Sequence, residues 1–317
     1  MAEQLRLFPE PGEEAGAASA PPADAQTRLT SRSSLSEAIE EFDRAMLLKG
    51  FTANTIAAFR ADLRILAGYI GASWPIGDIG TRELSDFMTF LVRERRRPCN
   101  PKSYARRLTT LKVFFAWLVE VGARASDPAA PLAHQAAPTP LPRVLSEGEI
   151  EQLLGAAQSL AAGEDGDPRP LLLVQLLLAT GMKKSEVMGI HLAHLDLSDP
   201  HAPLAHIRYA QARGRHKERT LRLPAALVPT LRAYRARYKP AEHLFECTAR
   251  NLEYVLRDLA RRAGLAGVSF EELRWTAALR DYRAGMDAEA LRKKLGLSKL
   301  RWTETQAKLE RLAEPAR

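Results

Sequence analysis

Five prolines fall between Ser126 and Pro142, and this stretch limits the possible folds more than any other part of the chain. Proline fixes φ and lacks a backbone N–H, so neither a helix nor a central strand is expected to run through it. Regular helical patterns lie on both sides. The chain of 317 residues is long enough for two domains, which we predict over 35–125 and 143–317, joined by a semi-extended, exposed linker over 126–142.

Residues 1–34 are rich in Ala, Pro, Glu and Ser and are predicted to form a disordered tail, because they offer too little apolar surface to bury. One island in the tail reads Gln4-Leu5-Arg6-Leu7-Phe8. It resembles the short peptide with which bacterial DNA-processing proteins bind the sliding clamp of the replication machinery. Gln4, Leu5, Leu7 and Phe8 are therefore candidate partner-binding residues, and an inert tail is the alternative.

The segment 35–125 has the pattern of a four-helix bundle. Ser34 and Glu37 predict a capping box at its start, and Thr52 precedes a second stretch with apolar residues at helical spacing. A third helix is predicted from Thr81 to about Arg93. The fourth is predicted to begin after Asn100, with proline at its first helical position.

Basic residues are concentrated in the last third of this bundle. The whole chain has a net charge of +8. Between Leu91 and Arg124 the sequence contains nine basic residues and only two acidic ones. Lys102 and Arg106 are four apart and lie opposite the apolar stripe of the predicted helix, where they could contact phosphates. Double-stranded DNA is thus the expected partner, and the candidate contacts in this domain are Arg96, Lys102, Arg106 and Arg107.

The segment 143–317 is predicted to be mostly helical with one small β-hairpin. Its first helix is marked by a second capping box, and Leu171 to Ala179 reads as a buried helix ended by Gly181. Alternating segments at 206–209 and 220–223 flank a basic loop, which is typical of a hairpin. We therefore expect a mainly α fold, an N-terminal four-helix bundle followed by a mostly helical domain.

Several classes of protein are not indicated. Cys99 and Cys247 stand far apart, and His191 and His194 lie three apart beside an apolar stretch, where a structural role is favoured over a metal site. We expect no metal and no cofactor. No long apolar run predicts a membrane span, and a cytoplasmic location at the nucleoid is expected.

The order of these elements resembles the tyrosine recombinase family, also called phage integrases, which includes the Xer-type resolvases. Gly50 to Thr55 and Phe59 to Leu63 are similar to the family's opening phrases, and Ala179-Thr180-Gly181-Met182-Lys183 is similar to its "A-T-G-L-R" phrase. The resemblance implies a tyrosine nucleophile that attacks a DNA phosphate without metal, assisted by two arginines, a lysine and histidines. Fixed cationic donors would stabilise the charge on the phosphate oxygens.

The sequence departs from that pattern at most of the positions that the resemblance implies for catalytic residues. All six of these positions, whether they depart or not, are Lys183, Arg213, Glu271, Arg274, Leu297 and Gln306. Only Arg274 keeps its identity, Glu271 replaces a histidine, and Gln306 stands where the tyrosine is implied. The hairpin loop is one residue longer than the pattern, so Arg213, Arg215 or Lys217 could take the place of the lysine. No tyrosine follows Tyr282.

We therefore interpret the chain as a DNA-binding protein of recombination or integration that lacks strand-cleaving chemistry. It would be an accessory or regulatory subunit beside an active recombinase or further copies of itself, contacting DNA also through Lys183, Arg213, Arg215, Lys217 and Arg274. An active strand-transferase using Ser298, Thr303 or Thr305 is an alternative. A clamp-tethered replication or repair factor is another. Arg274 could instead pair with Glu271 or Glu186 in a purely structural role.

Overall fold

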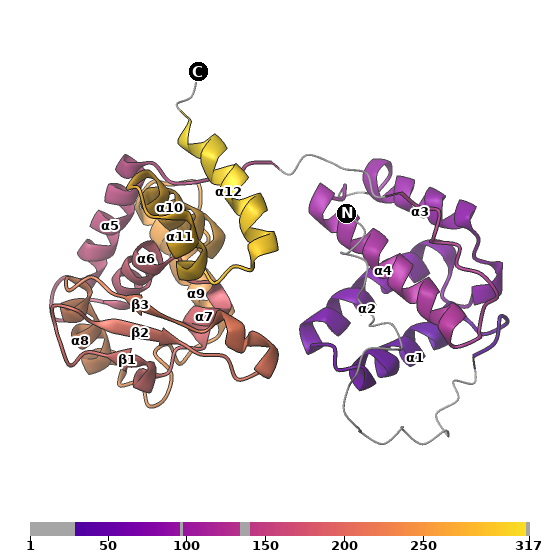
Figure 1. Cartoon of the computed structure of the whole chain (residues 1–317), viewed down its shortest axis with the longest axis horizontal. Coiled ribbons are helices and arrows are strands. Elements are labelled where there is room, and N and C mark those ends of the chain that lie inside the picture. The colour runs from indigo at the N-terminus through magenta and orange to yellow at the C-terminus, as the bar shows by residue number, and fades with distance from the viewer. Residues whose placement is uncertain (1–28, 96–97, 134–139, 315–317) are drawn as a thin grey trace. The chain divides into compact units, whose positions relative to one another are not determined.

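The computed structural model describes residues 29–95, 98–133 and 140–314 (Figure 1). The chain divides into two compact units, the second of which begins at Pro140. Each unit has its own hydrophobic core. Across the described residues, no helix is both long and apolar enough to span a bilayer.

The first unit is a bundle of helices, as the sequence predicts. Its helices are α1 (Leu35–Leu48), α2 (Ala53–Ile70), α3 (Thr81–Arg93) and α4 (Pro101–Glu120), with a short 3₁₀ helix η2 (Ile76–Asp78). The predicted capping box of Ser34 and Glu37 is present. The Asn100 side chain accepts a 2.8 Å hydrogen bond from the Ser103 amide, and Pro101 occupies the first turn. The local signals therefore set where these helices begin.

Aromatic rings fill the centre of this bundle. Phe42 of α1 packs edge-on against Phe114 of α4, with 5.3 Å between the ring centroids. The ring centroid of Trp117 lies 5.1 Å from that of Phe42. All three are at most 2% exposed. The apolar stripe of α4 thus faces the core, which leaves its other face for solvent.

The predicted linker is not exposed over its first part. Ala129 is fully buried in the core of the bundle, and the Thr81 hydroxyl donates a 2.9 Å hydrogen bond to the Pro128 carbonyl. Alanine and leucine side chains between the prolines supply the apolar surface for this packing. The prediction of an extended, exposed segment was therefore wrong for these residues.

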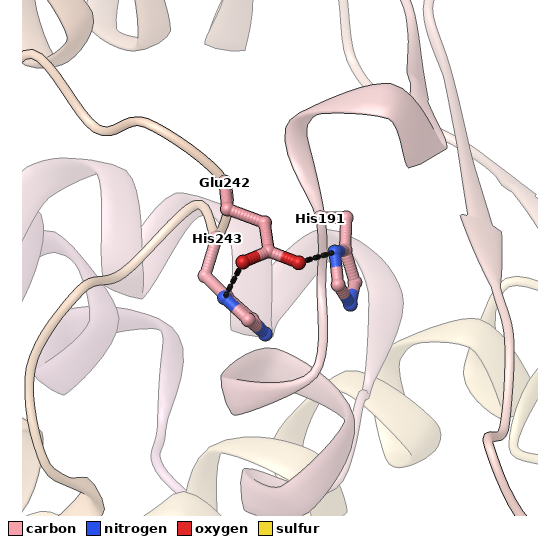
Figure 2. Close-up of side chains that lie close together, drawn as sticks. All are labelled: His191, Glu242 and His243. Carbon is pink, nitrogen blue, oxygen red and sulfur yellow. Dashed lines mark ion pairs between the residues drawn. The ribbon is translucent and has the colours of Figure 1, made fainter.

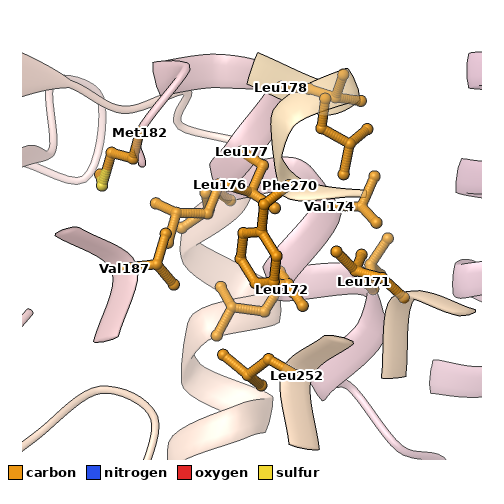
Figure 3. Packing of buried hydrophobic residues seen from close by; sticks show 14 of the residues in the cluster. Leu171, Leu172, Val174, Leu176, Leu177, Leu178, Met182, Val187, Leu252 and Phe270 are labelled. Carbon is orange, nitrogen blue, oxygen red and sulfur yellow. The ribbon is translucent and has the colours of Figure 1, made fainter. Parts of the chain in front are cut away.

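The second unit is mainly helical around a small sheet. Its helices are α5 (Glu147–Ala161), α6 (Arg169–Thr180), α7 (Lys184–Met188), α8 (Leu227–Tyr238), α9 (Ala249–Arg262), α10 (Phe270–Arg283), α11 (Ala288–Lys294) and α12 (Lys299–Ala313). The predicted buried helix is α6, which packs against α5, α8, α9 and α10. Figure 3 shows Leu172 and Leu176 of α6 beside Phe270 of α10. Gly181 ends α6 with φ of 61°, a conformation that suits glycine.

The sheet is antiparallel in the order β1 (Leu195–Asp196), β2 (Leu204–Ile207) and β3 (Arg219–Arg222). The predicted hairpin is β2 and β3, whose connection contains the 3₁₀ helix η4 (Ala212–Lys217). A 3₁₀ helix, η3 (Leu192–His194), directly precedes strand β1. Strand β1 was not predicted from the sequence. Two residues are too few to show an alternating pattern.

Candidate functional site

Five polar or charged side chains converge beside the end of α6. They come from α7 and the residue before it, from β2–β3 and from α10, and we call them the charged centre: Lys183, Glu186, Tyr209, Arg219 and Arg274. The apolar α6 packs against α10, and the tight turn at Gly181 leads from α6 directly into Lys183 and α7. Residues nearly a hundred positions apart in the sequence therefore share one site.

Glu186 is the anion at the middle of this centre. Its side chain is 1% exposed and accepts two hydrogen bonds from Arg219, of 3.1 Å and 2.9 Å, in a two-pronged pair. The Tyr209 hydroxyl donates a third. Burial opposes ionisation of Glu186, but the bonds from Arg219 and Tyr209 outweigh it and lower its pKa to about 2. Glu186 is therefore a carboxylate, and burial beside it raises the pKa of Tyr209 to about 12.

Arg274 lies on the second turn of α10, which is fixed by a capping box between Ser269 and Glu272. Its guanidinium donates to two main-chain carbonyls, those of Gly181 and, at 2.6 Å, Leu295. Burial lowers the pKa of Arg274 to about 10, so it still carries its charge near neutral pH. A direct pair with Glu186 or Glu271 was one alternative for Arg274, but the hydrogen bonds found run to main-chain oxygens.

Lys183 precedes α7 and approaches the same anion. Its Nζ lies 3.8 Å from a Glu186 carboxylate oxygen and 3.4 Å from the Gly296 carbonyl. Burial lowers the pKa of Lys183, and the nearby charges of Arg274 and Arg219 lower it further. The lysine is thus held by acceptors of this chain.

Main-chain carbonyls after α11 complete the centre. Arg219 Nε donates to the Lys294 carbonyl at 2.7 Å, in addition to its pair with Glu186. Gly296 has φ of 60°, and a Cβ built there would lie 2.6 Å from Arg219 Nη1. The glycine therefore allows the guanidinium to lie against the backbone. Arg219, Arg274 and Lys183 are thus each hydrogen-bonded to acceptors within the protein.

Two family profiles match the chain. Residues 143–309 match the phage integrase family, which is more than half of the chain. The chain belongs to the phage integrase family. Residues 39–122 also match the phage integrase N-terminal SAM-like domain, which corresponds to the bundle of α1 to α4.

Curated relatives of this integrase-family chain are tyrosine recombinases. XerC of Corynebacterium efficiens is 30% identical over 300 residues, covering 90% of this chain and 92% of the relative. XerD of Listeria monocytogenes is 24% identical over 296 residues, covering 88% and 96%. Both relatives are thus named tyrosine recombinases, in agreement with the family profile.

Solved structures share the fold at lower identity. XerH bound to a palindromic difH substrate in a post-cleavage complex has a TM-score of 0.71, 15% identity, and coverage of 90% of this chain and 96% of the other. A lambda integrase dimer bound to a COC′ core site has a TM-score of 0.69, 15% identity, and coverage of 90% and 79%. At these identities the likeness establishes the integrase fold alone.

Three of the integrase positions implied by the resemblance lie outside the charged centre, on α10, on α12 and in the turn between α11 and α12. Leu297 is half-buried against the α10 to α12 packing, and its carbonyl accepts a 2.6 Å bond from Arg292. Gln306 is half-buried on α12 and donates a 3.0 Å bond to Glu310 on the next turn. Glu271 is exposed on α10, where its charge raises the pKa of Arg274 slightly against the effect of burial.

The hydroxyls weighed as alternative nucleophiles are bonded within α12. The Ser298 hydroxyl caps the helix, accepting a 3.3 Å bond from the Arg301 amide. Thr303 and Thr305 donate to carbonyls one turn earlier, at 3.3 Å and 2.9 Å. Among the described residues, none of the three hydroxyls is hydrogen-bonded to a histidine or carboxylate that could act as its base.

The basic hairpin connection supplies candidates of two kinds. Arg215 is exposed and Lys217 is half-buried in η4, while the side chain of Arg213 lies outside what the structure describes. Lys217 contributes to lowering the pKa of Lys183, so it is near the charged centre. The choice among Arg213, Arg215 and Lys217 for the family lysine stays open.

Arg219 and Tyr209 were missed as site residues. A signal was present in the strand pattern, because Arg219 and the buried Leu221 are two apart on β3 and so lie on the same face. That face is turned toward the core. Arg219 therefore reaches the buried Glu186, which the sequence could not pair with it across 33 residues.

The predicted DNA-contact residues of the bundle differ in their exposure to solvent. Lys102 and Arg106 are exposed on α4, and Arg106 is bonded at 2.8 Å to the buried Asp62. Arg107 is only 8% exposed and is bonded to Asp62 and Cys99, so it lies inside the bundle and not on the expected surface. Burial raises the pKa of Asp62, and the two arginines oppose that rise. Arg96 and the Gln4 to Phe8 peptide fall outside the described residues.

Proposed function

We propose that this chain is a DNA-binding member of the phage integrase family that acts in site-specific recombination or integration without cleaving DNA itself. It would serve at the chromosome, in the cytoplasm, as an accessory or regulatory subunit. Its companion would be an active recombinase or further copies of this chain on the same duplex.

The observation that carries the proposal is that the cations of the charged centre are hydrogen-bonded to acceptors of this chain. Catalysis of phosphoryl transfer needs fixed donors aimed at the oxygens where charge develops. Here Arg219 and Arg274 direct their hydrogens at Glu186 and at main-chain carbonyls. A phosphate entering the centre would meet a carboxylate that stays ionised at all ordinary pH values. Those charges favour a structural role for the centre over a catalytic one.

The state of α12 supports the same conclusion. Gln306 has no nucleophilic atom, and its amide is engaged by Glu310. The nearby hydroxyls form hydrogen bonds within α12, and none of them is bonded to a base in the part of the chain that the structure describes. The alternative of an active strand-transferase therefore has weaker support from the geometry than the non-cleaving protein.

DNA binding is proposed from the exposed cations and from the relatives. Lys102 and Arg106 on α4 and Arg215 in the hairpin connection face solvent. XerH and lambda integrase, which share the fold, are described in complexes with DNA, the latter as a dimer. The bundle and the hairpin connection would each contact phosphates, so that both units bind the duplex.

The test is a cleavage assay on the DNA that the protein selects. DNA captured with the protein from its own cells is sequenced, and the bound site is remade with a nick that traps covalent intermediates. We expect binding without a covalent adduct. A covalent adduct of this protein that is lost on changing Ser298, Thr303 or Thr305 to alanine would overturn the proposal.

A gain-of-function variant makes the same test sharper. If the tyrosine were the one missing part, Gln306→Tyr would form the adduct. We expect Gln306→Tyr to remain inactive, because the donors of the charged centre stay bound to Glu186 and the carbonyls. An active Gln306→Tyr protein would show instead that the centre is competent.

A further inference from the structure

Two histidines and a glutamate meet at a site that neither the recombination fold nor the charged centre uses. His191 precedes η3, and Glu242 and His243 lie in the loop between α8 and α9 (Figure 2). His191 and His243 face each other across an isolated antiparallel bridge. Residues directly opposite in such a bridge carry their side chains on the same face. The separation of 52 positions hides this pairing from the sequence, where His191 and His194 gave no metal spacing.

The backbone holds these three residues in register. On one side of the bridge the Leu192 amide donates to the Glu242 carbonyl at 2.8 Å, and on the other the Leu244 amide donates to the Ile190 carbonyl at 2.8 Å. The Glu246 carboxylate accepts from the Ala241 and Glu242 amides, both at 2.8 Å, which fixes the start of the loop. The side chains therefore project from a pre-organised frame.

The donor atoms are already grouped. The Glu242 carboxylate lies between the two rings in Figure 2, with 3.4 Å to His191 Nδ1 and 4.0 Å to His243 Nδ1. One ligand atom from each residue falls within 4.8 Å of the others. The ring centroids of His191 and His243 are 4.2 Å apart. Ligands bound to one tetrahedral ion at 2.0–2.1 Å would be about 3.3 Å apart, so small side-chain rotations would complete the site.

We propose that His191, Glu242 and His243 bind one divalent transition-metal ion of the zinc class. Two imidazoles and one carboxylate suit zinc, cobalt, nickel or copper, whereas magnesium and calcium prefer oxygen ligands throughout. Water would fill the remaining position. The ion would fasten the segment before β1 to the loop between α8 and α9.

The surroundings allow an ion to enter and leave. His191 and His243 side chains are 35% and 38% exposed and that of Glu242 is 70% exposed. His194 lies beside the site, its ring centroid 4.8 Å from that of His191, and its Nδ1 accepts a 3.3 Å bond from the His191 amide. With Nδ1 thus used, His194 would orient the frame rather than act as a ligand through that atom. The site is a reversible one, responsive to the metal supply.

The test is calorimetric titration of the full chain, freed of any affinity tag and of metal by chelation, with zinc chloride. We expect one ion per chain, and a rise in the melting temperature on adding it. His191→Ala and His243→Ala should each weaken binding by about tenfold or more, since even the outer partners of metal ligands are worth 10–100-fold. Both variants should unfold like the wild type without metal, because the bridge is made by the backbone.

Two control variants separate this site from other zinc ligands. His201→Ala removes an exposed histidine of the β1–β2 connection, and Cys247→Ser removes the thiol nearest in sequence. Both should bind zinc as the wild type does, and cobalt should give an absorption spectrum without a thiolate band. Absence of binding, binding unaffected by His191→Ala and His243→Ala, or binding lost equally in a control variant would each overturn the proposal.

Discussion

At the scale of single residues, Glu186 determines the character of the charged centre. It is a carboxylate at 1% exposure whose partners are Arg219, Tyr209 and Lys183. A buried ion pair is not by itself a source of net stability, but it leaves an uncompensated charge when one partner is removed. The residues of the centre therefore depend on one another. Replacing Glu186 would leave the buried charge of Arg219 uncompensated and so destabilise the fold.

Removal of Glu186 should be strongly destabilising. In Glu186→Ala, Arg219 at 9% exposure would keep its charge without its two-pronged partner. We expect the free energy of unfolding to fall by about 3–5 kcal/mol, measured by urea denaturation. Glu151→Ala, an exposed residue of α5, should change it by less than about 0.5 kcal/mol. Equal effects of the two variants would show that the pair is not buried in solution.

The free energy of unfolding should depend on pH in acid because of Glu186. Its pKa of about 2 in the folded chain lies below the ordinary 4.5, so ionisation of Glu186 stabilises the fold above pH 4.5. That contribution, about 3 kcal/mol, is lost as the pH falls from 4.5 toward 2. The Glu186→Gln variant does not show this loss, because glutamine does not ionise.

Urea unfolding of wild type and Glu186→Gln from pH 6 to pH 2 measures this difference directly. The stability advantage of the wild type should shrink as the pH falls through this range. A difference that stays constant with pH would mean that Glu186 has an ordinary pKa.

At the scale of elements, the turn after α11 is where helix geometry and the charged centre meet. Gly296 and Gly285 both follow helices, with φ of 60° and 81°. A Cβ at Gly285 would have nothing within 4 Å, whereas one at Gly296 would lie 2.6 Å from Arg219. The two glycines thus share the backbone requirement, and Gly296 alone has the close approach to a guanidinium.

Replacement of the two glycines by alanine should separate these effects. Gly285→Ala is expected to lower the free energy of unfolding by about 1–2 kcal/mol, the cost of a left-handed residue with a Cβ. Gly296→Ala should lower it further and shift Arg219 away from Glu186. Chemical denaturation of both variants is the measurement. A Gly296→Ala protein as stable as Gly285→Ala would indicate that Arg219 moves aside freely.

What the sequence predicts at this scale is what neighbouring residues decide. The caps at Ser34 and Asn100 and the stop at Gly181 depend on bonds within a few positions, and all are present. The packing of Pro128 and Ala129 and the strand β1 were missed because they depend on partners distant in the sequence.

The candidate site shows the same division between local and distant causes. Lys183 and Arg274 were identified by phrases of the sequence, but each donates a hydrogen bond to a carbonyl in the distant turn after α11. Whether Arg274 holds a phosphate or the main chain depends on where those carbonyls fold. Arg107, placed on the surface by its charge, is drawn inside by the buried Asp62. Long-range pairing of this kind leaves no periodic signal.

At the scale of the whole molecule, DNA binding by two units makes a prediction about salt. Neutralising each phosphate releases counterions, so the slope of log K against log salt changes by about one for each cation that contacts DNA. Lys102 at the start of α4 is a better probe than Arg106, whose bond to the buried Asp62 would add a stability effect. In the second unit, Arg215 is the exposed probe.

Salt titrations of affinity for the captured DNA should therefore show additive losses. Lys102→Ala and Arg215→Ala are each expected to reduce the slope by about one, and the double variant by about two, if both units contact the same duplex. Lys49→Ala is the matched control, because Lys49 is bonded at 2.8 Å to Glu120 at the far end of α4, about 30 Å from its start. Its slope should equal that of the wild type. A double variant no weaker than Lys102→Ala would confine DNA contact to the bundle, and the second unit would then act through protein partners instead.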